Sequence, residues 1–410
     1  MSPEPEVTVP RGSAGGQRRD SHVPALDGVR GLAIILVLFV HFIGDARPSN
    51  AFERVLMHAS NYGVWGVDLF FVLSGFLITG ILYDSKGSTH YFRNFYMRRI
   101  LRIFPLYYGV LFLLFFLLPL IPSVVPAGLE EASRHQAWVW TYAVNLFIVP
   151  RGTWALPYIS HFWSLAIEEH FYLLWPIVVA FASTSTLLRI CAGCAVFSTL
   201  LRIVLYLAGL NEISIQVLTP CRLDALCIGG FLAIATRTGA REALIRAARP
   251  ALLVLGASIL LVSASSAATH ILPGVFHGFR TLLIALFFGA LILSSISAEA
   301  GDPIGRFFNH RAMRFTGKYS YGIYVFHGII AYALGDYQTE NIVAAWVGSH
   351  LGAVLLQAAV GVTLSIVVSV LSYEWFEKRF LRLKRWFGEE SPAMGQPVAP
   401  QVEANPVRIS

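Results

Sequence analysis

The sequence is short of charge. Only 13% of its 410 residues are Asp, Glu, Lys or Arg, about half the share of a typical soluble domain, while 56% are hydrophobic. So few charged side chains cannot cover the surface of a soluble protein of this size. The same figures exclude an intrinsically disordered chain and a collagen-like repeat. The remaining class is an integral membrane protein.

Cysteine is also scarce. The four cysteines, Cys191, Cys194, Cys221 and Cys227, are too few for a disulfide framework. Cys191 and Cys194 have the spacing of a redox or zinc motif, but no second pair and no histidine stands near them. We therefore expect no metal site. The Gly229–Gly230 pair lies in an apolar run, which favours close helix packing over a phosphate-binding loop.

Long apolar runs, by contrast, are abundant. A transmembrane helix needs about 20 mostly apolar residues. Runs of this kind occur at 26–45, 63–83, 101–120, 161–181, 189–209, 219–237, 251–268, 276–297, 318–337 and 349–372. The run 138–149 is too short to cross a bilayer alone and suggests an interfacial or re-entrant segment. We predict an all-α membrane protein with about ten transmembrane helices.

The basic residues predict the orientation of this bundle. If the N-terminus is cytoplasmic, most of the 31 lysines and arginines fall in cytoplasmic segments, and the outer loops hold only Arg47, Arg54, Arg134 and Arg151. We therefore predict a multi-pass protein of the cytoplasmic (inner) membrane with both termini in the cytoplasm. Residues 25–385 form the transmembrane domain, and 1–24 and 386–410 are expected to be disordered cytoplasmic tails. The net charge of +7 then reflects orientation in the lipid bilayer, and nucleic-acid binding is not expected because the basic loops lack aromatic platforms.

Polar residues inside the first apolar run share one helical face. Arg30 and His41 are eleven residues apart, which places them within about 20° of each other and ~16 Å apart along the axis. Asp27 falls on the same stripe. A charge in the bilayer core is costly, so this stripe indicates a partner, a water-filled cavity or a function.

Other helices contribute polar residues at a similar depth. His161 and Glu168 share a face because they are seven residues apart. The further members of this set are Asp68, Arg222, Asp224 and His327. One shared polar cavity explains them economically. For Arg222 and Asp224, buried ion pairs that hold helices together are an equally open interpretation.

A basic segment follows the second apolar run. Arg98, Arg99 and Arg102 stand in a predicted loop at the cytoplasmic border. They either fix the topology or clamp a polyphosphate, because guanidinium groups pair with phosphate oxygens.

Seven blocks of polar and aromatic residues follow one another along the chain: Leu26–Ala33 with His41, Gly66–Leu77, Arg98–Pro105, His161–Pro176, Arg222–Leu226, Tyr319–His327 and Tyr373–Lys378. In this order they resemble the acyltransferase type 3 family, integral-membrane O-acyltransferases that modify sugars, surface polysaccharides or macrolides. The resemblance implies a cytosolic acyl-CoA donor, a hydroxyl acceptor presented from the outer side, and a need for Arg30 and His41. Many relatives carry a soluble esterase-like domain after the last helix. Because only the predicted tail 386–410 follows the last helix in this sequence, we expect the stand-alone form.

These observations predict an acyl-CoA-dependent O-acetyltransferase. The donor acetyl-CoA would meet Arg98, Arg99 and Arg102, and His41 would act as general base towards a hydroxyl of a carbohydrate or glycan. Glu168 or Asp27 would orient the imidazole, and an arginine would stabilise the oxyanion. Trp163, Ser164 and the remaining intramembrane polar residues would shape the site. Direct transfer and an acyl-histidine intermediate both stay open, as do the acceptor and the oligomeric state.

A transporter or flippase for a polar or glycan substrate is the alternative. A polar cavity within a helical bundle fits that class too. Transporters often contain two matching halves, however, and the Arg30–His41 stripe and the block around Glu168 each occur once. The sequence therefore favours the enzyme.

Overall fold

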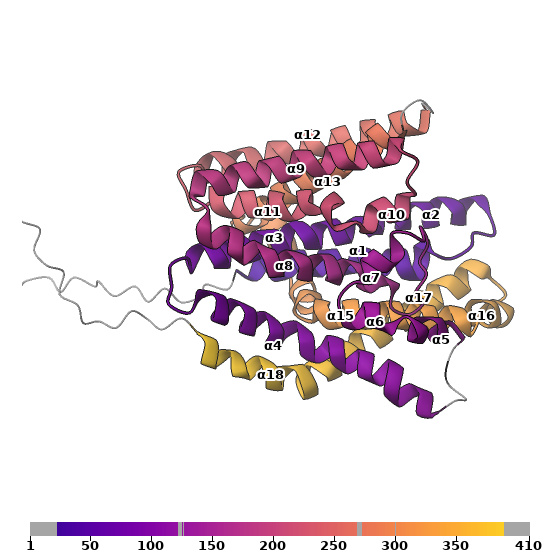
Figure 1. Ribbon diagram of the computed structural model, residues 1–410. Coiled ribbons are helices and arrows are strands. Elements are labelled where there is room, and N and C mark those ends of the chain that lie inside the picture. Colours follow the sequence, from indigo (N-terminus) through magenta and orange to yellow (C-terminus); the bar gives the residue numbers. More distant parts are fainter. Residues whose placement is uncertain (1–22, 122–124, 126, 269–272, 300, 389–410) are drawn as a thin grey trace, which may run out of the picture.

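The computed structural model describes residues 23–121, 125, 127–268, 273–299 and 301–388. Within these ranges the chain contains helices and no strand. The long helices lie side by side in one bundle (Figure 1). The two expected tails lie almost wholly outside the described residues, so their disorder stays a prediction.

Ten helices correspond to the ten predicted runs. They are α1 (Pro24–Phe39), α3 (Trp65–Asp84), α4 (Tyr91–Phe112), α8 (Trp163–Phe181), α9 (Thr184–Leu207), α11 (Leu223–Ala235), α12 (Arg241–Ala268), α13 (Pro273–Ile296), α15 (Arg311–Asp336) and α17 (His350–Ser372). A π-helical turn, η1 (Val40–Gly44), continues α1 and carries His41. Turns of this kind are rare and often occur at functional sites.

Short helices fill the connections. They are α2 (Ala51–Asn61), α5 (Ala127–Arg134), α6 (Gln136–Trp140), α7 (Val144–Ile148), η6 (Ser160–Phe162), α10 (Glu212–Val217), η7 (Thr219–Cys221), α14 (Pro303–Asn309), α16 (Thr339–Val347), η8 (Tyr373–Glu377), α18 (Lys378–Arg382) and η9 (Leu383–Phe387). Several starts are capped by side chains, for example α9 by Ser183, which accepts from the amide of Thr186, and α14 by Asp302. Such caps let the chain reverse direction between apolar helices.

Eight helical segments of the described chain are long and apolar enough to cross a membrane. Of the other two predicted spans, α11 is too short at 13 residues, and α15 has 26 residues but lower hydropathy because it carries several tyrosines and His327. The all-α membrane fold is thus confirmed. The number of crossings and the side on which the termini lie stay predictions.

The prediction that the basic segment forms a loop is wrong. Arg98, Arg99 and Arg102 lie inside α4, which begins at Tyr91 and continues past Pro105. Its tyrosines pack on α8 here, since Tyr91 and Tyr96 donate to the carbonyls of Pro176 and Leu173. This tertiary contact supports a helix whose charge content had suggested a loop. The predicted interfacial run 138–149 forms parts of α6 and α7.

Two closely packed helix pairs form the centre of the bundle, α1 with α15 and α3 with α11. In the second pair a Cβ atom on Gly75 would collide with the backbone of Leu226, and one on Gly229 with the backbone of Val72. The glycines therefore let the two backbones approach closely, as expected for small residues between membrane helices. The expectation that Gly229 serves packing is confirmed.

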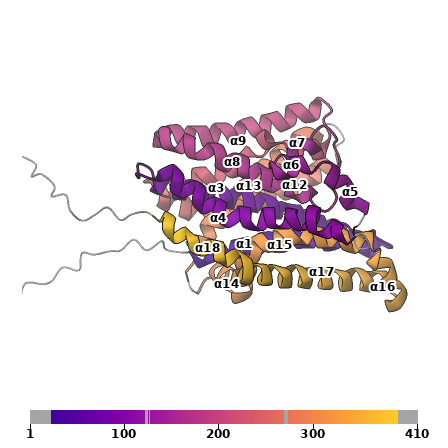
Figure 2. The ribbon, with the colours of Figure 1, turned by 60° about the horizontal axis from the view of Figure 1, so that its bottom comes forward.

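The outer layers cover this centre from two sides. Helices α9, α12 and α13 lie together on one side, and α4 lies on the other with α18 beside it (Figures 1 and 2). Successive long helices run in opposite directions, so each one starts at the end of the bundle at which the previous one stops. The arginines of α4 and the start of α15 therefore lie at one end of the bundle, which we call the basic end. His41 and the α2 connection lie towards the opposite end.

Candidate active site

A cavity of about 180 Å³ lies inside the bundle. Five helices line it: α1, α3, α4, α8 and α15. Its polar lining consists of Arg30, Ser74, Arg99, Arg102, Ser164, Glu168, Glu169, Tyr172, Ser320, Tyr321 and Tyr324. The remaining wall is apolar and comes mostly from α3, including Phe70, Phe71 and Leu77. A mostly apolar cavity with convergent polar groups is typical of a small-molecule site.

Three guanidinium groups reach this cavity. Arg30 comes from α1, where it also pairs with Asp27 at 2.9 Å, and Arg99 and Arg102 come from α4. In the described part of the chain, neither Arg99 nor Arg102 forms an ion pair, and the Nε atom of Arg99 is buried without a hydrogen-bond partner. A buried guanidinium normally has an anionic partner. The cluster therefore suits an anionic ligand. Arg98 is not among the residues that line the cavity.

Two carboxylates from α8 face the same space. Glu168 lies beside Ser74 and Tyr172, whose hydroxyl groups are 2.5 Å apart, and Glu169 lies among Arg99 and the tyrosines of α4. Glu168 was a predicted site residue, but Glu169 was not. A second consecutive carboxylate in a membrane segment was the signal that could have identified it.

A second polar cluster lies next to the cavity and contains three histidines. His41 of η1 and His161 of η6 each contact His327 of α15, with ring centroids 4.7 Å and 5.0 Å apart. The hydroxyls of Ser164 and Tyr324, which also line the cavity, are 2.5 Å apart, and Tyr324 donates to the carbonyl of His161 at 2.9 Å. Tyr324 and Ser164 thus stand between the cavity and the imidazoles.

The expected orientation of His41 by a carboxylate needs correction. Its Nδ1 atom is 2.9 Å from the carbonyl oxygen of Val37. Asp27 lies fourteen residues earlier on the same helix, ~21 Å away along the axis, and pairs with Arg30 instead. Glu168 lines the cavity, whereas His41 is not among its lining residues. Of the predicted stripe, Arg30 therefore lines the cavity, whereas His41 belongs to the neighbouring histidine cluster.

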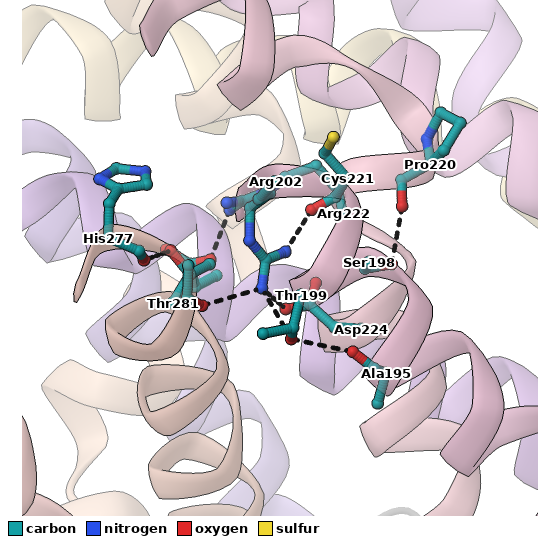
Figure 3. Close-up of polar contacts among 12 residues, drawn as sticks. Ala195, Ser198, Thr199, Arg202, Pro220, Cys221, Arg222, Asp224, His277 and Thr281 are labelled. Carbon is teal, nitrogen blue, oxygen red and sulfur yellow. Dashed lines mark hydrogen bonds and ion pairs between the residues drawn. The ribbon is translucent and has the colours of Figure 1, made fainter. Parts of the chain in front are cut away.

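Asp68, Arg222 and Asp224 of the predicted charged groups, together with Arg202, form two buried ion pairs. Arg202 donates to Asp224 at 2.7 Å and to the carbonyl of Cys221, and Figure 3 shows its side chain held between α9 and the start of α11. Arg222 pairs with Asp68 and so joins α11 to α3. None of these four residues lines the cavity. Removing one partner of a buried pair is strongly destabilising, so this arrangement supports a structural role.

The other predicted and missed residues lie close to the cavity. Trp163 is buried and packs edge-on against Phe71 at 6.1 Å. Ser74, Tyr172, Tyr321 and Tyr324 line the cavity although the sequence analysis gave them no role. Tyr321 and Tyr324 are three residues apart, and this helical spacing in a polar stretch of α15 was the available signal. No cluster of metal-ligand type occurs among the described residues.

Comparisons with known proteins show the family of this chain. A family model for an acyltransferase domain of type 3 matches residues 23–374. The chain is 27% identical to the peptidoglycan O-acetyltransferase OatA of Listeria monocytogenes over 75% of its length, and 25% identical to the O-acetyltransferase OatA of Staphylococcus aureus over 80%. It is 26% identical to the putative peptidoglycan O-acetyltransferase YrhL of Bacillus subtilis over 87%. The aligned segments cover 49%, 53% and 54% of these relatives, so the chain spans about half of their length. No solved structure matches the chain.

Proposed function

Because the chain belongs to the type 3 acyltransferase family, we propose that it is a membrane O-acetyltransferase that moves an acetyl group from acetyl-CoA to a hydroxyl of a glycan. The observation that carries this proposal is the cavity in which Arg30, Arg99 and Arg102 meet Glu168 and Glu169. It offers an anion site and carboxylates in one space bounded by apolar walls.

The donor is proposed to bind from the basic end. Acetyl-CoA carries phosphate groups, and arginine pairs with phosphate oxygens through charge-assisted hydrogen bonds. Arg99 supports this assignment because it lines the cavity and forms no ion pair with any residue that the structure describes. In this arrangement Arg99 and Arg102 hold the phosphates, and the thioester points along α1 past Tyr324 towards His41.

His41 is proposed to be the general base. Its Nδ1 atom faces a carbonyl oxygen, which can only accept, so Nδ1 carries the proton and Nε2 keeps a lone pair. Nε2 takes the proton of the acceptor hydroxyl while that oxygen attacks the thioester carbonyl. The carbon–sulfur bond breaks, sulfur keeps the electron pair, and the proton passes on to give the free thiol of CoA.

The proposal of a glycan as the acceptor rests on the names of the relatives. Two of them are named as peptidoglycan O-acetyltransferases, one of these putatively. His41 lies away from the basic end, so a glycan hydroxyl approaching from the opposite end would meet the imidazole directly. The cytoplasmic membrane is the setting proposed for this chain.

The test uses the full chain in liposomes with radiolabelled acetyl-CoA and an N-acetylglucosamine pentasaccharide. We expect label transfer in the wild type and a fall of about 10²–10⁴-fold in kcat for His41→Gln, because that is the usual contribution of a general base. His58→Gln, a change of an exposed histidine on α2, is the matched control and should keep full activity. A folded wild type that neither binds acetyl-CoA nor releases CoA would contradict the proposal, and a flux assay would then test the transporter alternative.

A further inference from the structure

Three imidazoles from three separate chain segments meet beside the cavity. The ring of His327 packs nearly perpendicular to that of His41, at 82°, and to that of His161, at 72°. His327 is completely buried and His161 is 6% exposed, whereas His41 is partly exposed. His327 is therefore the central member of the group, and His41 is the member that substrate can reach.

Backbone carbonyls fix the tautomers of the two buried rings. Nδ1 of His327 lies 2.7 Å from the carbonyl oxygen of Tyr324, and Nε2 of His161 lies 3.2 Å from that of Val325. A carbonyl oxygen can only accept, so these ring nitrogens carry the protons. The other nitrogens, Nε2 of His327 and Nδ1 of His161, are buried and have no hydrogen-bond partner. An unpartnered buried acceptor is uncommon and calls for an explanation.

We propose that His327 is a positioning residue for His41: a neutral imidazole that orients the base and stabilises its protonated form. This role rests on the proposed function. Both the lone pair and the ring face of a neutral imidazole are electron-rich, so either one attracts a positive neighbour. In many catalytic histidines a carboxylate accepts from the ring nitrogen that is not the base; the carbonyl oxygen of Val37 has that place here, and His327 acts through the contact between the two rings.

The surroundings of the pair support this assignment. Within the described chain His327 forms no ion pair, and the titratable groups that face it are His41, His161 and Tyr324. Asp45, four residues after His41, interacts electrostatically with His41 but forms no ion pair with it within 4 Å. A buried imidazole without an acidic partner stays neutral, because burying a charge is costly.

The local packing holds His327 in place. The ring of His161 lies directly against the backbone of α15 at Gly328, where a Cβ atom would collide with it. Tyr324, one turn before His327, is anchored by the hydroxyl of Ser164 and the carbonyl of His161. Gly328, which leaves room for the ring of His161, and these two hydrogen bonds of Tyr324 fix the positions of the three rings relative to one another.

A pair of substitutions separates a chemical role from a packing role. His327→Asn keeps a donor for the Tyr324 carbonyl but removes the acceptor at Nε2. His327→Gln can supply an acceptor oxygen at that position. Ile323→Val, a small change at a fully buried neighbour on the same helix, controls for altered packing. Each full-length variant is assayed in liposomes with acetyl-CoA and the N-acetylglucosamine pentasaccharide, and its thermal midpoint is recorded.

We expect kcat to fall about tenfold or more in His327→Asn, with the KM for acetyl-CoA unchanged and the acid limb of the pH–rate profile moved to lower pH. His327→Gln should recover part of kcat, and Ile323→Val should match the wild type. Two results would overturn the positioning role. One is an equal loss of kcat in His327→Asn and His327→Gln, and the other is a pH–rate profile that is lower at every pH while its acid limb stays at the wild-type pH. Inactivity of the wild type would instead refute the proposed function, so the two failures are distinguishable. If His327→Asn does not fold, the pH–rate profile of His327→Gln decides. An acid limb at the wild-type pH supports the positioning role, because the proposal requires an acceptor at this position, and a shifted acid limb contradicts it.

Discussion

At the scale of single residues, the partner of each charged group separates two kinds of site. Arg202 and Arg222 are buried and form ion pairs with Asp224 and Asp68, although the Nε atom of each lacks a hydrogen-bond partner. Arg99 lines the cavity and forms no ion pair with any residue that the structure describes. The first arrangement stabilises the contact between helices, and the second leaves binding capacity for a ligand.

Arg99→Gln should weaken donor binding. Loss of a charge-assisted hydrogen bond costs about 1.5–3 kcal/mol, so we expect the KM for acetyl-CoA to rise roughly 10- to 100-fold while kcat changes less. Steady-state kinetics at varied acetyl-CoA measure this change. Arg93→Gln on the exposed face of the same helix removes an equal charge outside the cavity and should leave KM unchanged. Equal effects of both variants would show that only the general positive field matters.

At the scale of helices, glycine contacts set how close the central pairs come. The α3–α11 contact places Ser74 and Leu77 on the cavity wall, one residue before and two after Gly75. Any separation of these helices therefore changes the shape of the site as well as the stability of the bundle. The same physical feature serves both packing and function.

Gly75→Ala should lower the thermal midpoint of the protein in detergent. The added Cβ would meet the backbone of Leu226, which cannot move aside as a flexible side chain would, and overpacking of this kind costs about 1–3 kcal/mol. Gly193→Ala on α9 is the control, because a Cβ there meets nothing within 4 Å. An unchanged midpoint for Gly75→Ala would mean that the two helices are not in close contact.

At the scale of the whole molecule, the two ends of the bundle differ in character. The basic end holds the start of α4 with its arginines, and the opposite end holds η1 with His41 and the short helices α2, α5, α6, α7, α10 and α16. Donor and acceptor would then approach from different sides and meet in the middle. This division requires a defined orientation in the membrane.

Cysteine labelling tests that orientation. Thr89 lies in the α3–α4 connection at the basic end, and Thr153 lies in the connection between α7 and η6 at the opposite end, and both are exposed. With a membrane-impermeant maleimide on intact cells, Thr153→Cys should react and Thr89→Cys should react only after permeabilisation, because basic loops stay in the cytoplasm. The reverse pattern would place both termini outside. The wild-type chain, with its four native cysteines, measures the background.

The sequence by itself determined the helical membrane fold and the residues worth examining. Apolar length is a property of one chain segment, so all ten predicted runs found their helix. The stripe of Arg30 and His41 also follows from a single helical period. The basic segment of α4 was mistaken for a loop because its hydrogen bonds to α8 depend on a distant part of the chain.

Only the tertiary structure decided how these residues are grouped. Which faces of two helices meet depends on their packing and rotation, which no local period encodes. The structure therefore separates Arg30 and the arginines of α4 from His41, pairs Arg202 with Asp224, and places His327 against His41. It also brings Glu169 and Tyr324 to the cavity wall. Sequence order provides the chemical groups, and close packing between distant helices determines which of them can act together.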